Sequence, residues 1–296
     1  MFRLSFDIGG TNLKVALVEN YKIKDRRSFF CSKIENEDIL EELIVKTINN
    51  WKEKYEFETF DFVGLGVPGE VSDNKIIKTP NLKLDIKNLP YNLSKTLNQS
   101  VKVENDAVCA SIADFLSLEN KPKSFLAVTL GTGIGGSLIY NGKIYRGAGF
   151  APLEIGHTVI EKDGIECSCG RAGCFEKYAS TSSLMQYYQE KSKEFKTAEE
   201  IMDLYQKNDK TAKETIERFV DYLSLGLVNL INIFAPDLIL LSGTFCKSME
   251  PIMNMISCNV NKYKYSKDDK LPKIKLSSLG ENAGLLGAAY LDFEKI

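Results

Sequence analysis

Several features that would point to particular classes of protein are scarce in these 296 residues. The chain has one tryptophan, and its 38 basic side chains nearly balance 40 acidic ones, which leaves a formal net charge of -2. A near-neutral chain lacks the basic surface that attracts nucleic acid or an anionic membrane. No apolar run approaches the roughly 20 residues that cross a bilayer. We therefore expect neither partner.

Two further absences concern the compartment. The first ten residues, MFRLSFDIGG, predict a strand and a turn and not a secretion signal, so we expect a cytoplasmic protein. The seven cysteines are an odd number without the spacing of a disulfide framework. Three of them are clustered and are treated below. Free cysteine is typically buried, so we expect core positions without a function for Cys31, Cys109, Cys246 and Cys258.

A weak internal repeat organises the chain. Residues 4–23 (LSFDIGGTNLKVALVENYKI) and residues 126–144 (LAVTLGTGIGGSLIYNGKI) each combine two apolar runs with a Gly/Thr turn, which predicts a β-hairpin. Residues 60–69 and residues 236–243 are short apolar runs that end in glycine, and each follows a helical pattern. This order predicts a duplicated α/β fold with mixed sheets. A chance similarity of two glycine turns is the alternative.

Apolar residues at helical spacing predict two long helices, over residues 39–51 and residues 219–233. Shorter helices are expected at residues 105–118, 181–193, 197–207, 247–264 and 281–292. The length suits two domains. No long linker separates them, so we expect them to meet around a cleft.

The two glycine-rich turns are candidate phosphate sites. Glycine has no Cβ, so backbone N–H groups in such turns can approach an anion closely. In the first turn Thr11 adds a hydroxyl donor, Lys14 a cation, and Asp7 a carboxylate for the water shell of Mg²⁺. Plain hairpin turns are the alternative, and neither a Walker nor a dinucleotide fingerprint is present. The turn residues concerned are Gly9, Gly10, Thr11, Gly131, Thr132 and Gly133.

An asparagine and an acid stand where a strand runs into a helix, in the segment VKVENDAV of residues 101–108. Asn and Asp are common N-caps, and position alone favours that role for Asn105 and Asp106. The same position favours an ionised carboxylate. A kinase needs such a carboxylate to take the proton of the attacking hydroxyl.

The clustered cysteines follow the only histidine in the pattern H-x9-C-x-C-x4-C, formed by His157, Cys167, Cys169 and Cys174. Three thiolates and one imidazole suit tetrahedral zinc, and four protein ligands make such a site structural. Free thiols beside an unrelated histidine are the alternative. Two acids flank the cluster, Glu154 and Glu176. They are either solvated surface acids or fixed hydrogen-bond acceptors for sugar hydroxyls.

An ordered set of motifs resembles the ROK family of bacterial sugar kinases and repressors, in the actin/hexokinase/Hsp70 superfamily. The resemblance covers essentially the whole chain. The motifs are DIGGT (residues 7–11), VPG (67–69), ENDA (104–107), LGTGIGG (130–136), ExGH (154–157) and CxCGxxGCxE (167–176). The last of these is the most specific. The resemblance implies a duplicated actin-like, ribonuclease H-like ATPase fold with residues 1–115 and 285–296 in one domain and residues 116–284 in the other.

The resemblance also implies roles. Asp106 would be the catalytic base of an ATP-dependent hexose kinase that uses Mg²⁺ and carries a structural zinc, with glucose as the leading substrate. The implied sugar-binding residues are Asn81, Asn105, Glu154, His157 and Glu176. The implied nucleotide-binding residues are Asp7, Gly9, Gly10, Thr11, Asn12, Lys14, Thr132, Gly133 and Gly243. The family is commonly dimeric or tetrameric, so a homodimer or homotetramer is expected.

Three departures from the family pattern affect the substrate pockets. The segment around Gly243 has fewer glycines than usual, the tryptophan often found after PNL is replaced by Lys83-Leu84-Asp85, and Pro152-Leu153 precedes Glu154. N-acetylglucosamine, N-acetylmannosamine and fructose kinases share the same motifs and stay open. A non-catalytic sugar sensor is another alternative. A DNA-binding repressor is disfavoured because only six residues precede Asp7.

Overall fold

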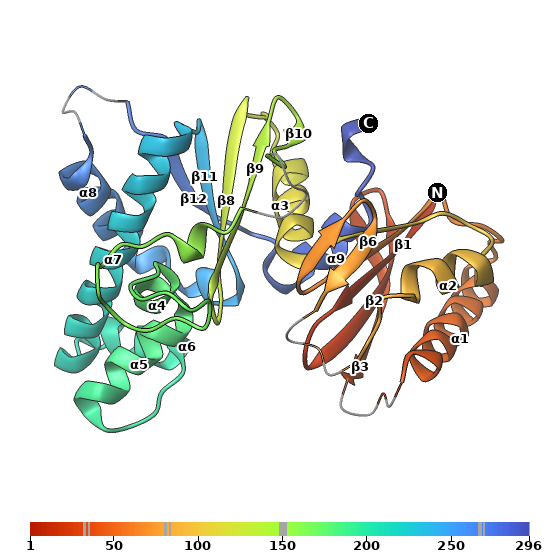
Figure 1. Ribbon diagram of the computed structural model, residues 1–296, viewed down its shortest axis with the longest axis horizontal. Helices are drawn as coiled ribbons and strands as arrows, with labels where there is room; N and C mark the ends of the chain where they lie inside the picture. Colours follow the sequence, from red (N-terminus) through yellow and green to blue (C-terminus); the bar gives the residue numbers. More distant parts are fainter. Residues whose placement is uncertain are drawn as a thin grey trace. The chain divides into compact units, whose positions relative to one another are not determined.

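The computed structural model describes residues 1–31, 34, 36–79, 82, 84–147, 153–265, 268 and 270–295. The chain divides into two compact units (Figure 1). Unit 1 comprises Met1–Glu119, Tyr145–Pro152 and Asn282–Ile296, and unit 2 comprises Asn120–Ile144 and Leu153–Glu281. The domain boundaries implied after residue 115 and before residue 285 stay a prediction. Among the described residues, no helix has the length and apolar character to span a bilayer.

Unit 1 is built on a five-stranded sheet in the order β3-β2-β1-β4-β7. Its strands are β1 (Phe2–Ile8), β2 (Asn12–Glu19), β3 (Lys22–Phe30), β4 (Phe62–Val67) and β7 (Val101–Asn105). The first three form an antiparallel meander, and β4 and β7 are parallel to β1. A small separate hairpin consists of β5 (Glu70–Ser72) and β6 (Lys75–Lys78).

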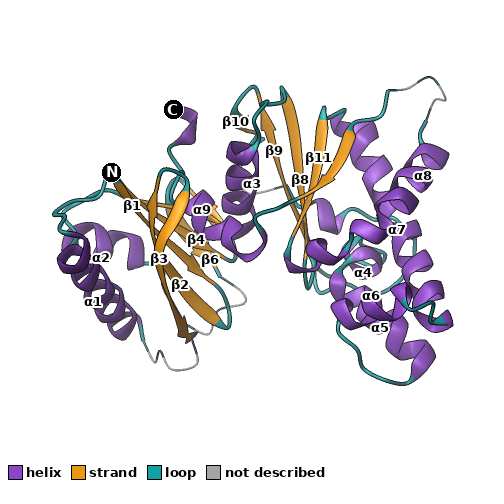
Figure 2. Ribbon diagram, turned by 180° about the vertical axis from the view of Figure 1, so that it is seen from behind, coloured by secondary structure: helices purple, strands orange, loops and turns teal. Residues whose placement is uncertain are grey.

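Helices cover both faces of the unit 1 sheet (Figure 2). On one face lie α1 (Glu37–Tyr55) and α2 (Leu89–Thr96), and on the other lie α3 (Asp106–Ser117) and α9 (Ala283–Ala288). The only tryptophan, Trp51 of α1, is buried in the core that α1 shares with the sheet. The contact between α3 and α9 is close, because a Cβ at Gly287 would lie 1.6 Å from the Cys109 carbonyl oxygen.

The sheet of unit 2 repeats this topology in the order β10-β9-β8-β11-β12. Its strands are β8 (Ser124–Leu130), β9 (Ile134–Tyr140), β10 (Lys143–Ile144), β11 (Leu238–Ser242) and β12 (Lys273–Leu276). Again the first three strands form an antiparallel meander, and two further strands join β8 in parallel. The internal duplication predicted from the two glycine turns is therefore confirmed.

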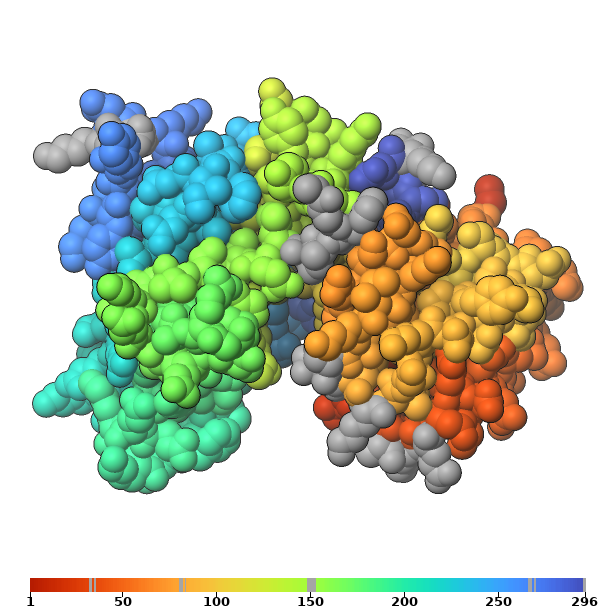
Figure 3. Space-filling model, viewed as in Figure 1, coloured from red at the N-terminus to blue at the C-terminus, as the bar shows by residue number. Residues whose placement is uncertain are grey.

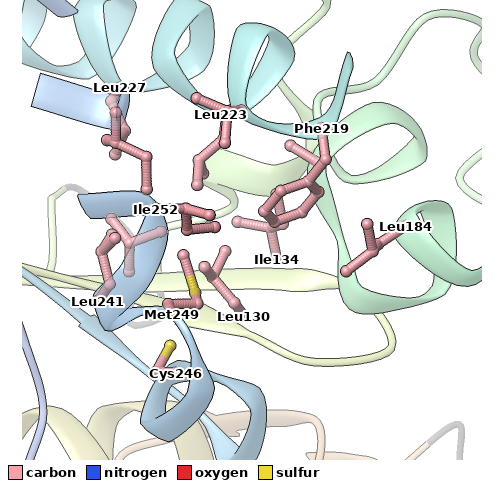
Figure 4. Close-up of a cluster of buried hydrophobic side chains, with 14 of the residues drawn as sticks. Leu130, Ile134, Leu184, Phe219, Leu223, Leu227, Leu241, Cys246, Met249 and Ile252 are labelled. Carbon is pink, nitrogen blue, oxygen red and sulfur yellow. The ribbon is translucent and has the colours of Figure 1, made fainter. Parts of the chain in front are cut away.

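The helices of unit 2 bury their apolar faces against this sheet. They are α4 (Glu176–Ala179), α5 (Thr181–Ser192), α6 (Ala198–Gln206), α7 (Lys210–Phe234) and α8 (Met253–Tyr263). Figure 4 shows the central core, where Phe219 and Leu223 of α7 meet Leu130 of β8 and Leu241 of β11. Gly226 of α7 is packed so tightly that a Cβ would lie 2.1 Å from the Phe175 ring.

Some sequence expectations differ from the structure. The helix expected over residues 247–264 is two 3₁₀ turns followed by α8, because Pro251 has no N–H for an α-helical hydrogen bond. The helix expected over residues 281–292 is only α9 with flanking 3₁₀ turns, and the short α2 was not expected. The expected burial of the scattered cysteines holds for Cys109 and Cys246. It is wrong for Cys258, which is exposed on α8, and Cys31 is only partly buried.

Candidate functional site

The first phosphate-type turn, residues 9–11, connects β1 to β2 and is held by hydrogen bonds to its own backbone and to Cys31. The Gly9 N–H donates to the Asn12 carbonyl at 2.9 Å. Cys31 donates its N–H to the Thr11 carbonyl at 2.8 Å and its thiol to the Gly9 carbonyl at 3.1 Å. Gly10 and Thr11 are exposed. Hydrogen bonds to Asn12 and Cys31 thus fix the turn, while Gly10 and Thr11 at its tip are accessible to a ligand.

Asp7 is the next-to-last residue of β1, beside this turn. It pairs in register with Lys14 of β2, whose Nζ lies 3.8 Å from its Oδ2. The helix α9 approaches from the other side, and a Cβ at Gly284 would lie 3.2 Å from the Asp7 carboxyl carbon. Burial raises the pKa of Asp7, and the charge of Lys14 offsets part of that effect. A buried carboxylate next to a phosphate-type turn is a suitable group for the water shell of a magnesium ion.

Asp106 is the first residue of α3, and its carboxylate Oδ1 accepts the Ala107 N–H at 2.8 Å. Burial, and then the nearby negative charge of Asp7, raises the pKa of Asp106 to about 6. Backbone hydrogen bonds lower it only in part. A carboxyl with a pKa close to the working pH is suited to accept a proton from a hydroxyl.

Asn105 is the N-cap of α3, as its position predicted. Its Oδ1 accepts the N–H groups of Ala107 and Val108 at 2.9 and 3.2 Å. Its Nδ2 donates to the Gly69 carbonyl at 2.9 Å, which ties the ENDA and VPG motifs together. Since Nδ2 has a second hydrogen, the amide keeps one donor for a ligand. The sugar contact implied for Asn105 stays a prediction.

In unit 2, the equivalent turn of residues 131–133 connects β8 to β9. The Gly131 N–H donates to the Gly133 carbonyl at 3.0 Å, and the Gly131 carbonyl accepts the Thr181 N–H at 2.9 Å. A Cβ at Gly133 would lie 2.5 Å from Glu176 Oε2. Thr132 is exposed. The absence of a side chain at position 133 therefore makes room for a carboxylate implied in sugar binding.

Gly243 follows β11 with a φ of +120°, a conformation that other residues rarely adopt. A Cβ there would lie 2.1 Å from the Leu130 carbonyl oxygen, at the end of β8. The segment after β11 and the turn of residues 131–133 are thereby neighbours. This proximity is compatible with the adenosine-binding role implied for Gly243.

The cluster of His157, Cys167, Cys169 and Cys174 is assembled in unit 2, with all four ligand atoms within 4.8 Å of one another. His157 Nδ1 lies 3.6 Å from Cys167 Sγ, and Cys169 Sγ lies 3.5 Å from Cys174 Sγ. Two sulfurs at about 2.3 Å from a tetrahedral zinc ion would be about 3.8 Å apart. Both the donor set and its spacing fit a structural zinc ion.

The loop that carries the three cysteines is shaped by glycines and backbone hydrogen bonds. Gly173 has a φ of +82°, and a Cβ there would lie 1.7 Å from the Glu161 carbonyl oxygen. The Cys167 N–H donates to the Arg171 carbonyl at 2.8 Å. This segment, residues 158–174, lies in light green on the surface of unit 2 in Figure 3. Such a short polar loop has little core of its own, so a metal would stabilise it.

The thiols of the cluster differ in how readily they lose a proton. A hydrogen bond from the Arg171 backbone lowers the pKa of exposed Cys169 to about 6. Burial raises the pKa of Cys174 to about 12. A bound dication reverses the effect of burial, because it stabilises the thiolate directly. Without a metal the Cys174 thiol is protonated, and a bound dication would bring it to the thiolate form that zinc requires.

Glu154 and Glu176 lie on opposite sides of the His157 ring. Nδ1 of the ring is 3.7 Å from Glu176 Oε1, and Nε2 is 3.9 Å from Glu154 Oε2. Glu176 also accepts the Cys167 thiol at 3.2 Å and begins α4. Glu154 is 66% exposed, whereas Glu176 is 17% exposed. The three side chains form one polar patch next to the metal ligands.

The sequence-predicted residues thus form one group in each unit. Unit 1 brings together Asp7, the turn of residues 9–11, Lys14, Asn105 and Asp106. Unit 2 brings together the turn of residues 131–133, Glu154, His157 and Glu176, with Gly243 next to that turn. Asn81 lies outside the described residues. Sequence reasoning missed Cys31 as a support of the phosphate-type turn, and no local motif marks that role.

Comparison with known proteins matches this architecture. The sequence model of the ROK family matches residues 3–295. An N-acetyl-D-glucosamine kinase of Vibrio atlanticus is 31% identical, with 98% of this chain and 99% of that protein covered. The xylose repressor of Bacillus subtilis is 30% identical, with 86% of this chain and 67% of the repressor covered.

Solved structures show the same fold. A ROK glucokinase from Streptomyces griseus in complex with glucose and AMPPNP has a TM-score of 0.83 at 23% identity, covering 98% of this chain and 99% of that one. A ROK hexokinase from Thermus thermophilus has a TM-score of 0.86 at 24% identity and covers 100% of both chains. With its duplicated sheets and a family match over nearly its whole length, this protein belongs to the ROK family and has the actin-like ATPase fold.

Proposed function

We propose that the protein transfers the γ-phosphoryl group of ATP to a hydroxyl group of a hexose. The observation that carries this proposal is Asp106, a carboxyl at the start of α3 whose pKa is raised to about 6. Such a group is roughly nine-tenths ionised at pH 7 and takes up a proton readily. Asp106 accepts the hydroxyl proton as the hexose oxygen attacks the γ-phosphorus. The bond between the γ-phosphorus and the bridging oxygen breaks, and ADP leaves, so that no free alkoxide is formed.

Each glycine turn offers donors to a nucleotide. Gly10, Thr11 and Thr132 are exposed, and their backbone N–H groups would donate to phosphate oxygens. Gly243, next to the turn of residues 131–133, would border the adenosine. Lys14 adds a positive charge beside Asp7. Asp7 would hold the water shell of Mg²⁺, and the ion, when bound, supplies charge neutralisation at the β- and γ-phosphates.

Zinc has a structural role in this proposal. His157, through the Nδ1 that faces Cys167, and the three thiolates would hold the ion, which would then have four protein ligands and no open position for a reaction. The ring then carries its proton on Nε2, which faces Glu154 and can donate to a sugar hydroxyl. Glu154 and Glu176 accept from neighbouring hydroxyls, and Asn105 contributes its remaining amide hydrogen.

Glucose is the leading substrate, and N-acetyl-D-glucosamine is the second candidate because relatives of 26–31% identity that align over nearly the whole chain bear that kinase name. A coupled assay of ADP release, with ATP and each of glucose, N-acetyl-D-glucosamine, N-acetylmannosamine, mannose and fructose, separates these substrates. The control is Asp106→Asn, which should bind the preferred sugar in calorimetry without turning it over. Full turnover by that variant would contradict the role of the base.

A non-catalytic sugar sensor is the alternative from another class, favoured by the similarity to a xylose repressor. Binding of a sugar, together with no ADP release in the presence of any hexose of the panel, would support it. We further expect a homodimer or homotetramer, which light scattering of the purified protein measures.

A further inference from the structure

Three carboxylates of unit 1 act on one buried group, the thiol of Cys109 on α3. Burial raises the pKa of that thiol, and the negative charges of Glu104, Asp106 and Asp7 raise it further. Like charges gathered in a buried region destabilise one another unless each has a partner.

The three carboxylates differ in how their charge is compensated. Asp7 has Lys14 at 3.8 Å, and Asp106 accepts a backbone N–H. Glu104 is only 6% exposed, and its Oε2 accepts the Nη2 of Arg146 at 2.5 Å. Its other oxygen, Oε1, accepts the N–H of Asn105 at 2.9 Å. Glu104 thus connects Arg146 to Asn105, the N-cap residue of α3.

The geometry points to Arg146 as a positioning residue for phosphoryl transfer, which holds Glu104 against Asn105 and cancels its charge beside Asp106. This inference rests on the proposed kinase function. Arg146 is not a catalytic residue in it, because it acts only through Glu104. Two effects are expected when Arg146 is lost: the start of α3 is less well fixed, and an uncompensated negative charge remains next to the base.

Among the described residues, Asp7 on β1 is the charged group that acts on Asp106, and Asp7 has Lys14 of β2 as its partner. Glu104 stands two residues before Asp106 at the end of β7, and Cys109 stands three residues after it on α3. The neighbouring elements α9 (AGLLGA) and β4 (FVGLGV) contribute no titratable side chain. A change in the net charge of the Glu104–Arg146 pair should therefore shift the pKa of Asp106.

The test measures kcat against pH at saturating ATP and hexose in four variants. Arg146→Met should lower kcat by about 10- to 100-fold and move the acid limb of the profile to higher pH. Adding Glu104→Gln to Arg146→Met should restore most of the activity and move the acid limb back to its wild-type position. The neutral amide keeps the contact with the Asn105 N–H and needs no counter-charge. Glu104→Gln alone should move the limb to lower pH. Arg27→Met, which removes a partly exposed arginine paired with Asp25 in the same unit, should leave kcat unchanged.

Two results would overturn this inference without touching the proposed function. One is a wild-type enzyme that is active while Arg146→Met has the same kcat and the same acid limb. Another is a loss in Arg146→Met that Glu104→Gln does not rescue, which would mark a purely structural role. If Arg146→Met does not fold, Arg146→Lys keeps the charge and should retain the wild-type acid limb. A wild type without turnover on any hexose would instead overturn the proposed function, and this inference with it.

Discussion

Asparagine at position 106 should stabilise the folded protein while it stops phosphoryl transfer. In the wild type, burial and the charge of Asp7 raise the pKa of Asp106 from 3.8 to about 6. A shift of about two pK units corresponds to about 3 kcal/mol of unfavourable free energy in the ionised form. Asparagine is neutral and nearly isosteric, and its Oδ1 can still accept the Ala107 N–H. The variant therefore keeps the contact and loses the charge.

The sign of this effect depends on pH. Because the folded-state pKa is raised, the wild type has its full stability below about pH 4, where Asp106 is protonated in both states. That stability is lost as the pH rises through about 6. The gain of Asp106→Asn should thus be up to about 3 kcal/mol at pH 7.5 and less than about 1 kcal/mol at pH 4.

Trp51 makes this measurable. It is the only tryptophan and is buried in the hydrophobic core of unit 1. Asp106 belongs to the same unit. Urea unfolding followed by Trp51 fluorescence at both pH values gives the free energy of unfolding of that unit. Asp61→Asn, at an exposed position of the same unit, is the matched control and should change stability by less than about 0.5 kcal/mol. No gain at pH 7.5, or a gain that is undiminished at pH 4, would refute the argument.

Four further outcomes follow from the site. The pKa of Asp106 predicts that kcat/KM falls about tenfold per pH unit below about pH 6, and a profile flat to pH 5 would contradict this. Cys31→Ala should raise the KM for ATP several-fold, because the Gly9 carbonyl loses its donor. Cys31→Ser keeps a donor and should not raise it. Equal KM values in both variants would argue against a role for the thiol. Gly133→Ala displaces Glu176 and should raise the KM for the hexose, whereas an unchanged KM would mean that Glu176 does not bind sugar. Metal analysis should find one zinc per chain, lost in Cys174→Ser together with about 2–5 kcal/mol or more of stability; protein purified without metal would contradict the cluster.

Much of the architecture was predictable because its signals are local or repeated. The two glycine turns and the apolar runs that follow them in each half predicted two sheets of the same topology. The antiparallel pairing of β1 with β2 and of β8 with β9, and the matching strand orders, confirm this. The helix over residues 247–264 was less predictable, because a proline in the pattern changes its first turns to 3₁₀ geometry. The exposure of Cys258 could not be predicted either, since burial depends on the direction in which α8 packs.

The sequence by itself determined the features whose partners are neighbours along the chain: the glycine turns, the N-cap at Asn105, and the ligand cluster of residues 157–174. Short-range geometry is enough for these. Only the tertiary structure decided what surrounds them. The raised pKa of Asp106 needs Asp7 and burial, and the compensation of Glu104 needs Arg146. These effects depend on desolvation and on charges brought together from distant segments, and no local pattern in a chain encodes either of them.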